Sequence, residues 1–252
     1  MAAWIWSFRL PVCTLAGLQA VASFWVAGMD PSWLVAVAVF FIACATMLQN
    51  DWRDRYHDRR KGKVVALEHP GTFLALLLAC WSICGLFLLL VVIEDNRTGI
   101  VLSLMAFAGM VYSETRLMPM VPVTLVAVTA ASPSLLPAVA GASVDTVWPL
   151  FLSFVLVVFG REVTKDLDDE NIDRGYKWTI PLAWGNRWAK ITAAIALTVG
   201  LVVLFFVSSA VLPGILFAMI GVILLICGAS PRGSRAYLDL GMALAILTLV
   251  VD

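Results

Sequence analysis

The sequence predicts an all-α, polytopic membrane protein with nine transmembrane helices. Of its 252 residues, 62% are hydrophobic and only 13% are charged, and the mean hydropathy is +0.94. Soluble domains carry about 25% charged residues, so a soluble fold could not bury this much apolar surface. The apolar runs are continuous, which favours membrane helices over the alternating strands of a membrane barrel. The formal net charge is zero, so composition indicates no nucleic-acid partner.

A transmembrane helix needs about 20 apolar residues to cross a hydrocarbon core of about 30 Å. Nine runs approach this length, and we treat residues 1–252 as one membrane-embedded domain. The predicted spans are 11–29, 32–49, 72–93, 98–113, 119–142, 147–160, 188–209, 211–228 and 236–251. The fifth run contains four prolines and should be kinked or broken, which requires hydrogen bonds from neighbouring helices. These prolines are Pro119, Pro122, Pro133 and Pro137.

The basic residues predict the orientation of the chain in the bilayer. With nine spans, all of the 17 Lys and Arg residues except Arg97 fall on the side of the N-terminus. Basic residues near membrane helices favour the cytoplasmic side. We therefore expect a multi-pass protein whose N-terminus and two long polar loops, 50–71 and 161–187, are cytoplasmic.

Each polar loop follows an apolar run without a break, so we expect each to extend its membrane helix. Residues three or four positions apart share one face of a helix. In the first loop Asn50, Asp54 and Asp58 form such a stripe, and Asp51 lies beside it.

The second loop repeats this pattern with more acidic residues. Its stripe consists of Glu162, Asp166, Asp169 and Asp173, and Glu170 adjoins it. Like charges one turn apart repel, and a hard divalent cation would relieve this repulsion. Magnesium takes oxygen ligands and usually binds through one or two carboxylates together with substrate phosphates. One charged loop alone would be typical of a solvated connector, but two stripes on one side favour a shared ligand.

The basic residues of the loops have two interpretations. They can set the topology and contact anionic lipid of the bilayer, or they can hold phosphate oxygens. Arg161, Lys165 and Lys177 are the candidates for phosphate binding. His57 lies to the side of the first stripe, and we expect it to be a solvated loop residue rather than a base.

These motifs resemble those of the UbiA superfamily of intramembrane prenyltransferases. The first family motif, Asn-Asp-x-x-Asp-x-x-x-Asp, corresponds here to Asn50, Asp51, Asp54 and Asp58. The second motif corresponds to Asp166, Asp169, Asp173, Gly175, Thr179 and Pro181. The pair Tyr112-Ser113 after the fourth run also resembles a family feature. The resemblance covers nearly the whole chain.

The resemblance implies a helical ring around a central cavity, with a polar cap over its cytoplasmic mouth. The two motifs would face each other there and bind Mg²⁺ and an isoprenyl diphosphate. The implied metal ligands are Asn50, Asp54, Asp58, Asp166, Asp169 and Asp173. The implied substrate-binding residues are Asn50, Asp51, Arg161, Lys165 and Lys177. The five aspartates of the metal site and Tyr112, which would stabilise an allylic cation, are the implied catalytic residues.

The expected reaction is transfer of an isoprenyl group from an allylic diphosphate to an acceptor. A membrane terpene cyclase of the same superfamily would use the same metal site and remains an alternative. A transporter is a further alternative, but transporter sites usually lie near the bilayer midplane. The sequence lacks the basic-Pro stretch that often follows the first motif, and the fifth run lacks an expected Asn. These departures leave the acceptor and the preferred chain length of the isoprenoid open.

Overall fold

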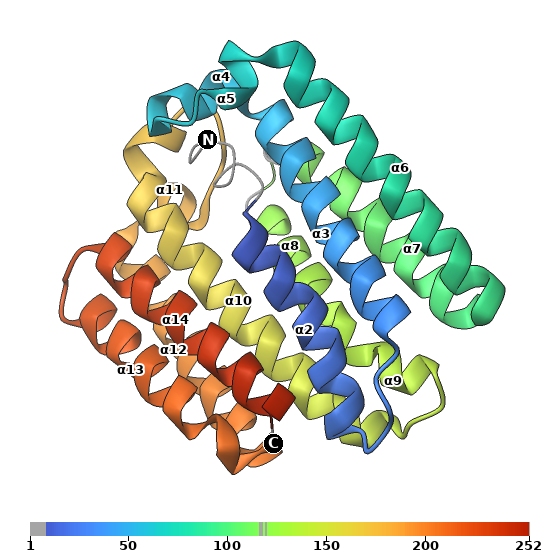
Figure 1. The fold of residues 1–252 in the computed structure, drawn as a ribbon. Coiled ribbons are helices and arrows are strands. Elements are labelled where there is room, and N and C mark those ends of the chain that lie inside the picture. Colours follow the sequence, from blue (N-terminus) through green and yellow to red (C-terminus); the bar gives the residue numbers. More distant parts are fainter. Residues whose placement is uncertain (1–8, 116–117, 119, 252) are drawn as a thin grey trace.

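The structure is a computed structural model that describes residues 9–115, 118 and 120–251. Within these residues the regular elements are α-helices and short 3-10 helices, which confirms the all-α class (Figure 1). The first half contains α2 Leu10–Val26, α3 Trp33–Arg53, α4 Arg55–Asp58, η1 Arg59–Lys61, α5 Val65–Glu68, α6 Pro70–Glu94, α7 Asn96–Val111, η2 Tyr112–Thr115, α8 Val121–Ala131, η3 Ser132–Leu135 and α9 Leu136–Val139. The second half contains α10 Val144–Asp173, α11 Ile180–Trp184, α12 Asn186–Val207, η4 Ser209–Val211, α13 Leu212–Ile226 and α14 Pro231–Val251.

Each of the nine predicted runs overlaps a helical segment, but not every segment has the length of a membrane span. Seven helical segments of the described chain are long and apolar enough to cross a membrane. The other two, α2 with 17 residues and α7 with 16, are apolar but shorter. The structure therefore supports a multi-pass membrane protein, whereas nine full spans are not confirmed.

The predicted break in the fifth run occurs at Pro133. There α8 ends, and the chain continues through η3 into α9. Two polar side chains of α2 bind the interrupted backbone. Gln19 donates from Nε2 to the Ala131 carbonyl at 3.4 Å and to the Ser134 hydroxyl at 3.0 Å. Ser23 donates to the Pro133 carbonyl at 3.2 Å, so buried polar groups in this apolar region are satisfied as a membrane interior requires.

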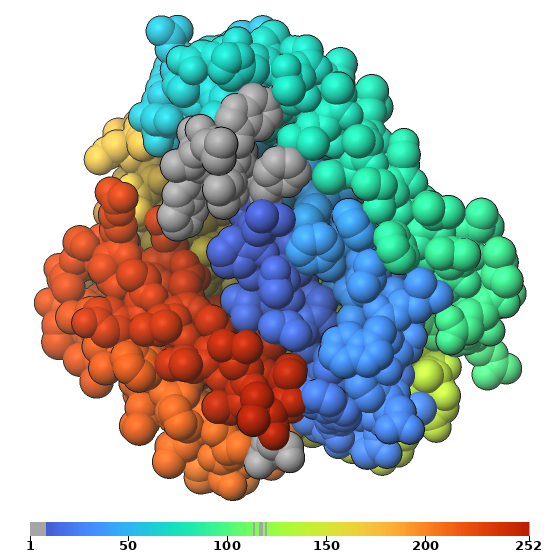
Figure 2. All heavy atoms as spheres, in the orientation of Figure 1, coloured from blue at the N-terminus to red at the C-terminus, as the bar shows by residue number. Residues whose placement is uncertain are grey.

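The helices pack in a closed order. Starting from α2, successive contacts run through α3, α7, α8, α10, α12, α13 and α14 and return to α2, while α6 packs on α3 and α7. Figure 2 shows α14 and α2 side by side on one face of the molecule. The largest hydrophobic cluster combines residues of α10 to α14 with Ala22 of α2 and Val123 and Ala131 of α8. This largest cluster is therefore shared between the two halves, while two further clusters belong to the first half.

Small residues allow α10 and α12 to approach closely. A methyl group added to Gly160 would lie 2.6 Å from Leu197 Cγ and 2.9 Å from the Ala193 carbonyl oxygen. Across the same contact, Ser153 donates its hydroxyl to the Gly200 carbonyl at 2.9 Å. This packing fixes the rotation of α10 two residues before its acidic stripe begins.

The short helices of both polar loops lie at the same end of the bundle. Figure 1 shows α4, α5 and α11 at this end and the C-terminus at the opposite end. A cavity of about 140 Å³ lies near the opposite end, against Phe24, Val35 and Val91. A much smaller one, of about 10 Å³, adjoins Asp51 and Asp58. The expected central cavity beneath a polar cap is not confirmed.

Candidate active site

The first acidic motif lies where α3 ends. Regular helix stops at Arg53, and Asp54 adopts φ −90° and ψ 4° before α4 begins. The expectation of one uninterrupted helix through Asp58 is therefore wrong. The motif carboxylates are nevertheless withdrawn from solvent, with Asp54 2% and Asp58 4% exposed. The bend turns α4 and η1 across the end of the bundle, so the first motif does not project into solvent.

The second acidic motif continues α10 to its last residue, as predicted. The helix runs for 30 residues without interruption as far as Asp173. Asp166 and Asp173 are buried, whereas Asp169 keeps partial exposure. Because α10 is anchored along its length by α12 and α8, its acidic stripe has a fixed direction.

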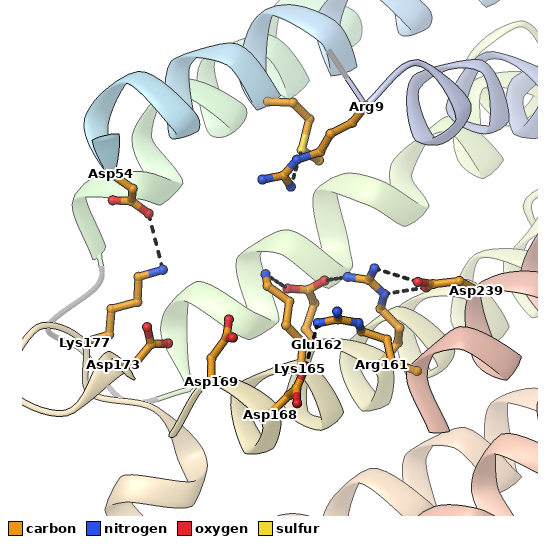
Figure 3. A network of polar contacts seen from close by, with 12 residues as sticks. Arg9, Asp54, Arg161, Glu162, Lys165, Asp168, Asp169, Asp173, Lys177 and Asp239 are labelled. Atoms are coloured by element: carbon orange, nitrogen blue, oxygen red, sulfur yellow. Dashed lines mark hydrogen bonds and ion pairs between the residues drawn. The ribbon is translucent and has the colours of Figure 1, made fainter. Parts of the chain in front are cut away.

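The two motifs face each other across the site, and lysine side chains join them. Lys61, just after the first motif, contacts Asp169 at 2.6 Å and Asp173 at 3.1 Å. Lys177, just after the second, contacts Asp54 at 3.3 Å, and Figure 3 shows Asp54 approaching it from the opposite side to Asp169 and Asp173. Burial disfavours the charge of Lys61, but the hydrogen bonds and negative charges of Asp169 and Asp173 together outweigh it and raise the pKa of Lys61 above its usual value.

An aromatic pair also joins the motifs. His57 of the first motif has its Nε2 2.9 Å from Asp173 Oδ1, and Tyr176 donates its hydroxyl to Asp54 Oδ1 at 2.9 Å. The two rings stack on each other with centroids 3.9 Å apart and planes at 12°. The expectation that His57 is a solvated loop residue is wrong, because it is 6% exposed and bound to the other motif. Sequence spacing gave no signal for this contact, since 116 residues separate His57 from Asp173.

Asp51 and Asp58 belong to a second group of ion pairs beside the first motif. Asp51 contacts Arg9 at 2.7 Å and Lys63 at 3.3 Å, and Lys63 also contacts Asp58 at 2.9 Å. Burial disfavours ionisation of Asp58, but the Lys63 ammonium group together with the charges of Lys61 and Lys177 outweighs it and holds the pKa of Asp58 below its usual value. Arg9, considered in the sequence only as an orientation signal, thus ties the start of α2 to the motif.

Of the three basic residues predicted to bind phosphate, only Lys177 lies between the two motifs. Arg161 is held by Glu162 and by Asp239 of α14, with Nε 2.8 Å from Asp239 Oδ1. Lys165 contacts Glu162 at 2.7 Å. Figure 3 shows this chain of charges along α10 leading away from the motifs toward α14. Arg161 and Lys165 therefore neutralise Glu162 in this structure.

Tyr112 and Asn50 adjoin the site. Asn50 is partly buried at the end of α3 and directly precedes Asp51. Tyr112 follows α7 and begins η2, and the charges of Arg9 and Asp54 act on its hydroxyl. The structure therefore brings Tyr112 near the first motif.

The donor atoms of the site suit a hard divalent cation. All five predicted aspartate ligands offer carboxylate oxygens, which magnesium prefers. Asp166 Oδ2 is buried and has no hydrogen-bond partner among the described residues, which is costly unless a ligand provides one. No three acidic, His or Cys side chains of the described chain converge closely enough to hold an ion as they stand. Lysines lie between the acids instead.

Residues 10–236 match the UbiA prenyltransferase family, and this match includes both acidic motifs. The chain belongs to the UbiA prenyltransferase family. No curated protein sequence matches the chain.

Solved structures have the same UbiA fold over almost the whole chain. An apo UbiA homologue from Aeropyrum pernix K1 is 16% identical, with a TM-score of 0.80 over 97% of this chain and 98% of that one. A digeranylgeranylglyceryl phosphate synthase structure is 18% identical, with a TM-score of 0.69 over 99% of this chain and 97% of that one. A UbiA homologue from Archaeoglobus fulgidus, bound to GPP and Mg²⁺, is 16% identical, with a TM-score of 0.65 over 98% and 99%.

Proposed function

We propose that this protein is a magnesium-dependent intramembrane prenyltransferase that moves an isoprenyl group from an allylic diphosphate to an acceptor. The observation that carries the proposal is the convergence of the two acidic motifs, which Lys61 joins by contacting Asp169 at 2.6 Å. The Archaeoglobus fulgidus homologues bound to GPP or DMAPP together with Mg²⁺ support the same ligands for this chain. The acceptor is left unspecified.

The proposed ligands of magnesium are Asn50, Asp54, Asp58, Asp166, Asp169 and Asp173. Magnesium bound there would neutralise the charge that develops on the diphosphate leaving group. Lys61 now contacts Asp169 and Asp173, and Lys177 contacts Asp54. Both ammonium groups can donate to diphosphate oxygens when these carboxylates bind magnesium instead. Asp51, held by Arg9 and Lys63, orients Lys63 toward the same region. Arg161 and Lys165 are also proposed to bind the diphosphate. To do so, their side chains must first break their contacts with Glu162.

The reaction breaks the allylic carbon–oxygen bond, and the diphosphate leaves with the electron pair. A nucleophilic atom of the acceptor then forms a bond to the allylic carbon and gives up its proton. The surrounding apolar helices would keep water from the carbon, which protects a reactive cation. The ring of Tyr112, near the first motif, is proposed to face that carbon and stabilise its positive charge.

The test measures diphosphate release from geranyl diphosphate by the purified protein in nanodiscs, together with binding of a thio-diphosphate analogue. Asp54→Asn and Asp166→Asn should each lower Mg²⁺-dependent release on the order of 100-fold. Asp145→Asn, on α10 but at its first turn and exposed, is the matched control and should retain it. Formation of a cyclic product without acceptor would favour a terpene cyclase. Unchanged turnover in both motif variants, or no binding of the analogue, would end the proposal and favour a transporter.

We also propose that the N-terminus and both motif loops face the cytoplasm, from the distribution of basic residues. Reporter fusions at the N-terminus and in the loop after Gly141 test this orientation. Only the first should report a cytoplasmic location.

A further inference from the structure

The stacked pair of His57 and Tyr176 has a reciprocal arrangement. Each ring comes from one motif and binds a carboxylate of the other motif. His57, in α4 between Asp54 and Asp58, contacts Asp173 at 2.9 Å. Tyr176, three residues after Asp173, donates to Asp54 at 2.9 Å. The two contacts therefore cross between the motifs, and the stacked rings lie where they cross.

The physical chemistry of the pair favours a rigid connection. An ionised carboxylate has only acceptor oxygens, so His57 Nε2 carries the hydrogen in its bond to Asp173. The side chains of His57 and Asp173 are 4% and 1% exposed, and a charge-assisted hydrogen bond is stronger than a neutral one. Ring stacking at 3.9 Å restricts both rings, so movement of one carboxylate would disturb the contact to the other. Lys61 and Lys177 also join the motifs, but their flexible stems allow the distance to vary.

We propose that His57 and Tyr176 act together as an aromatic brace that positions Asp54 and Asp173 relative to each other. Both are positioning residues, because they would act through the carboxylates of Asp173 and Asp54 that they contact. The inference rests on the proposed function, in which Asp54 and Asp173 bind magnesium from opposite motifs. Residues that orient metal ligands typically contribute about 10- to 100-fold to metal affinity or activity.

Tyr176→Phe tests the brace with the smallest change, because it removes one oxygen and leaves the stacked ring. His57→Phe keeps a ring but removes the hydrogen bond to Asp173, and His57→Gln restores a donor without the ring. The matched control is Tyr56→Phe, which removes a hydroxyl from the neighbouring, 68% exposed tyrosine of α4. All variants are compared as full-length protein in nanodiscs.

The readout is the metal concentration for half-saturation, measured by electron paramagnetic resonance of Mn²⁺ in the presence of geranyl thiodiphosphate. Tyr176→Phe and His57→Phe should each raise it about 10-fold or more, while Tyr56→Phe leaves it unchanged. In turnover, the same variants should lower kcat and raise the Mg²⁺ requirement, with a smaller effect on KM. His57→Gln should recover part of the metal affinity.

The double variant His57→Phe/Tyr176→Phe shows whether the rings act as one unit. For one brace, the double variant should lose little more metal affinity than the worse single variant. Effects of two independent contacts would instead add, and full additivity would overturn the proposal. A fall in melting temperature with unchanged metal affinity would also overturn it, since a merely structural role predicts that result.

The outcomes separate this inference from the proposed function. If wild type and Tyr176→Phe bind the metal with equal affinity, the brace is contradicted and the proposed function is not. Wild-type protein that binds no metal with the analogue contradicts both proposals. If His57→Phe does not fold, Tyr176→Phe and its control still decide the question.

Discussion

At the residue scale, the acids of the two motifs differ in how their charge is balanced. Asp54, Asp58, Asp169 and Asp173 each contact a lysine. Asp166 is also buried, yet its Oδ2 has no hydrogen-bond partner among the described residues. A buried carboxylate without full compensation destabilises the protein around it. Active sites commonly retain such groups for function.

Asp166→Asn should therefore separate stability from activity. Removing this charge should leave the melting temperature in EDTA unchanged or raise it, while turnover falls on the order of 100-fold. Asp168→Asn is the control, because Asp168 is half-buried on the same helix and faces Arg235 at 3.7 Å. Thermal melting and diphosphate release measure the two effects. A lower melting temperature for Asp166→Asn would show that this carboxylate has a stabilising partner.

Lys61→Met should reveal competition between a lysine and a metal ion for the same acids. Without Lys61, Asp169 and Asp173 lose a buried cation, and breaking a buried ion pair costs about 3 kcal/mol or more. The variant should melt at a lower temperature than wild type in EDTA. Excess Mg²⁺ should then raise its melting temperature by more than it raises that of wild type.

The control for this experiment is Arg59→Met, which removes an exposed cation from the start of the same 3-10 helix. Its melting temperature should respond to Mg²⁺ as wild type does. Equal Mg²⁺ stabilisation in Lys61→Met and wild type would mean that Lys61 does not compete with the metal.

The sequence predicted the acids of the site better than their partners. Helical spacing indicated that Asp166, Asp169 and Asp173 share a face, and α10 carries them in one helix. His57 was expected in solvent because periodicity describes one element at a time, and its partner lies on another. The contact between Arg9 and Asp51 was missed for the same reason, since the two residues lie on different elements.

At the scale of elements, the two motif helices end differently although their sequences look alike. Both continue from an apolar run directly into charged residues, the first after Asn50 and the second after Gly160, which stays inside α10. α10 remains helical through its motif, whereas α3 stops at Arg53 and the chain turns at Asp54. The contacts of Asp54 with Lys177 and Tyr176 stabilise the turn at Asp54. These are tertiary contacts, so local helix propensity does not predict them. The break in the fifth run was predictable, because prolines remove helical hydrogen bonds regardless of context.

Gln19→Leu tests the hydrogen bonds that α2 provides to this break. The substitution removes donors from the Ala131 carbonyl and the Ser134 hydroxyl and should destabilise the protein by about 1 kcal/mol. Thermal melting of Gln19→Leu, Ser134→Ala and the double variant measures the coupling between the two side chains. Strictly additive losses would indicate that the contact contributes nothing to stability.

At the scale of the whole molecule, each half of the chain supplies one motif, and the largest hydrophobic cluster contains residues of both halves. Ala22, Val123 and Ala131 of the first half pack in the same cluster as residues of α10 to α14. The connection between the halves passes through Gly141 and Ser143, which are exposed at the end opposite to the acids. Such exposed turns are preferred sites for tolerated chain breaks.

A chain divided after Ala142 should therefore reassemble when 1–142 and 143–252 are produced together. The co-expressed halves should co-purify and bind the thio-diphosphate analogue with Mg²⁺. Neither half alone should bind it, because each contains only one acidic motif. Binding by an isolated half would contradict a site shared between the motifs.

The interrupted α8–η3–α9 segment has a consequence for how related sequences can diverge. Gln19 and Ser23 lie in an apolar helix, where a buried polar side chain without a partner would destabilise the protein. Both donate hydrogen bonds to the interrupted, proline-containing segment. In a relative that replaced the prolines and regained an unbroken helix, Ser23 would keep its hydrogen bond to the Ala20 carbonyl at 2.7 Å, but Gln19 would lose its acceptors. Aligned homologues should therefore lose the glutamine and the prolines together.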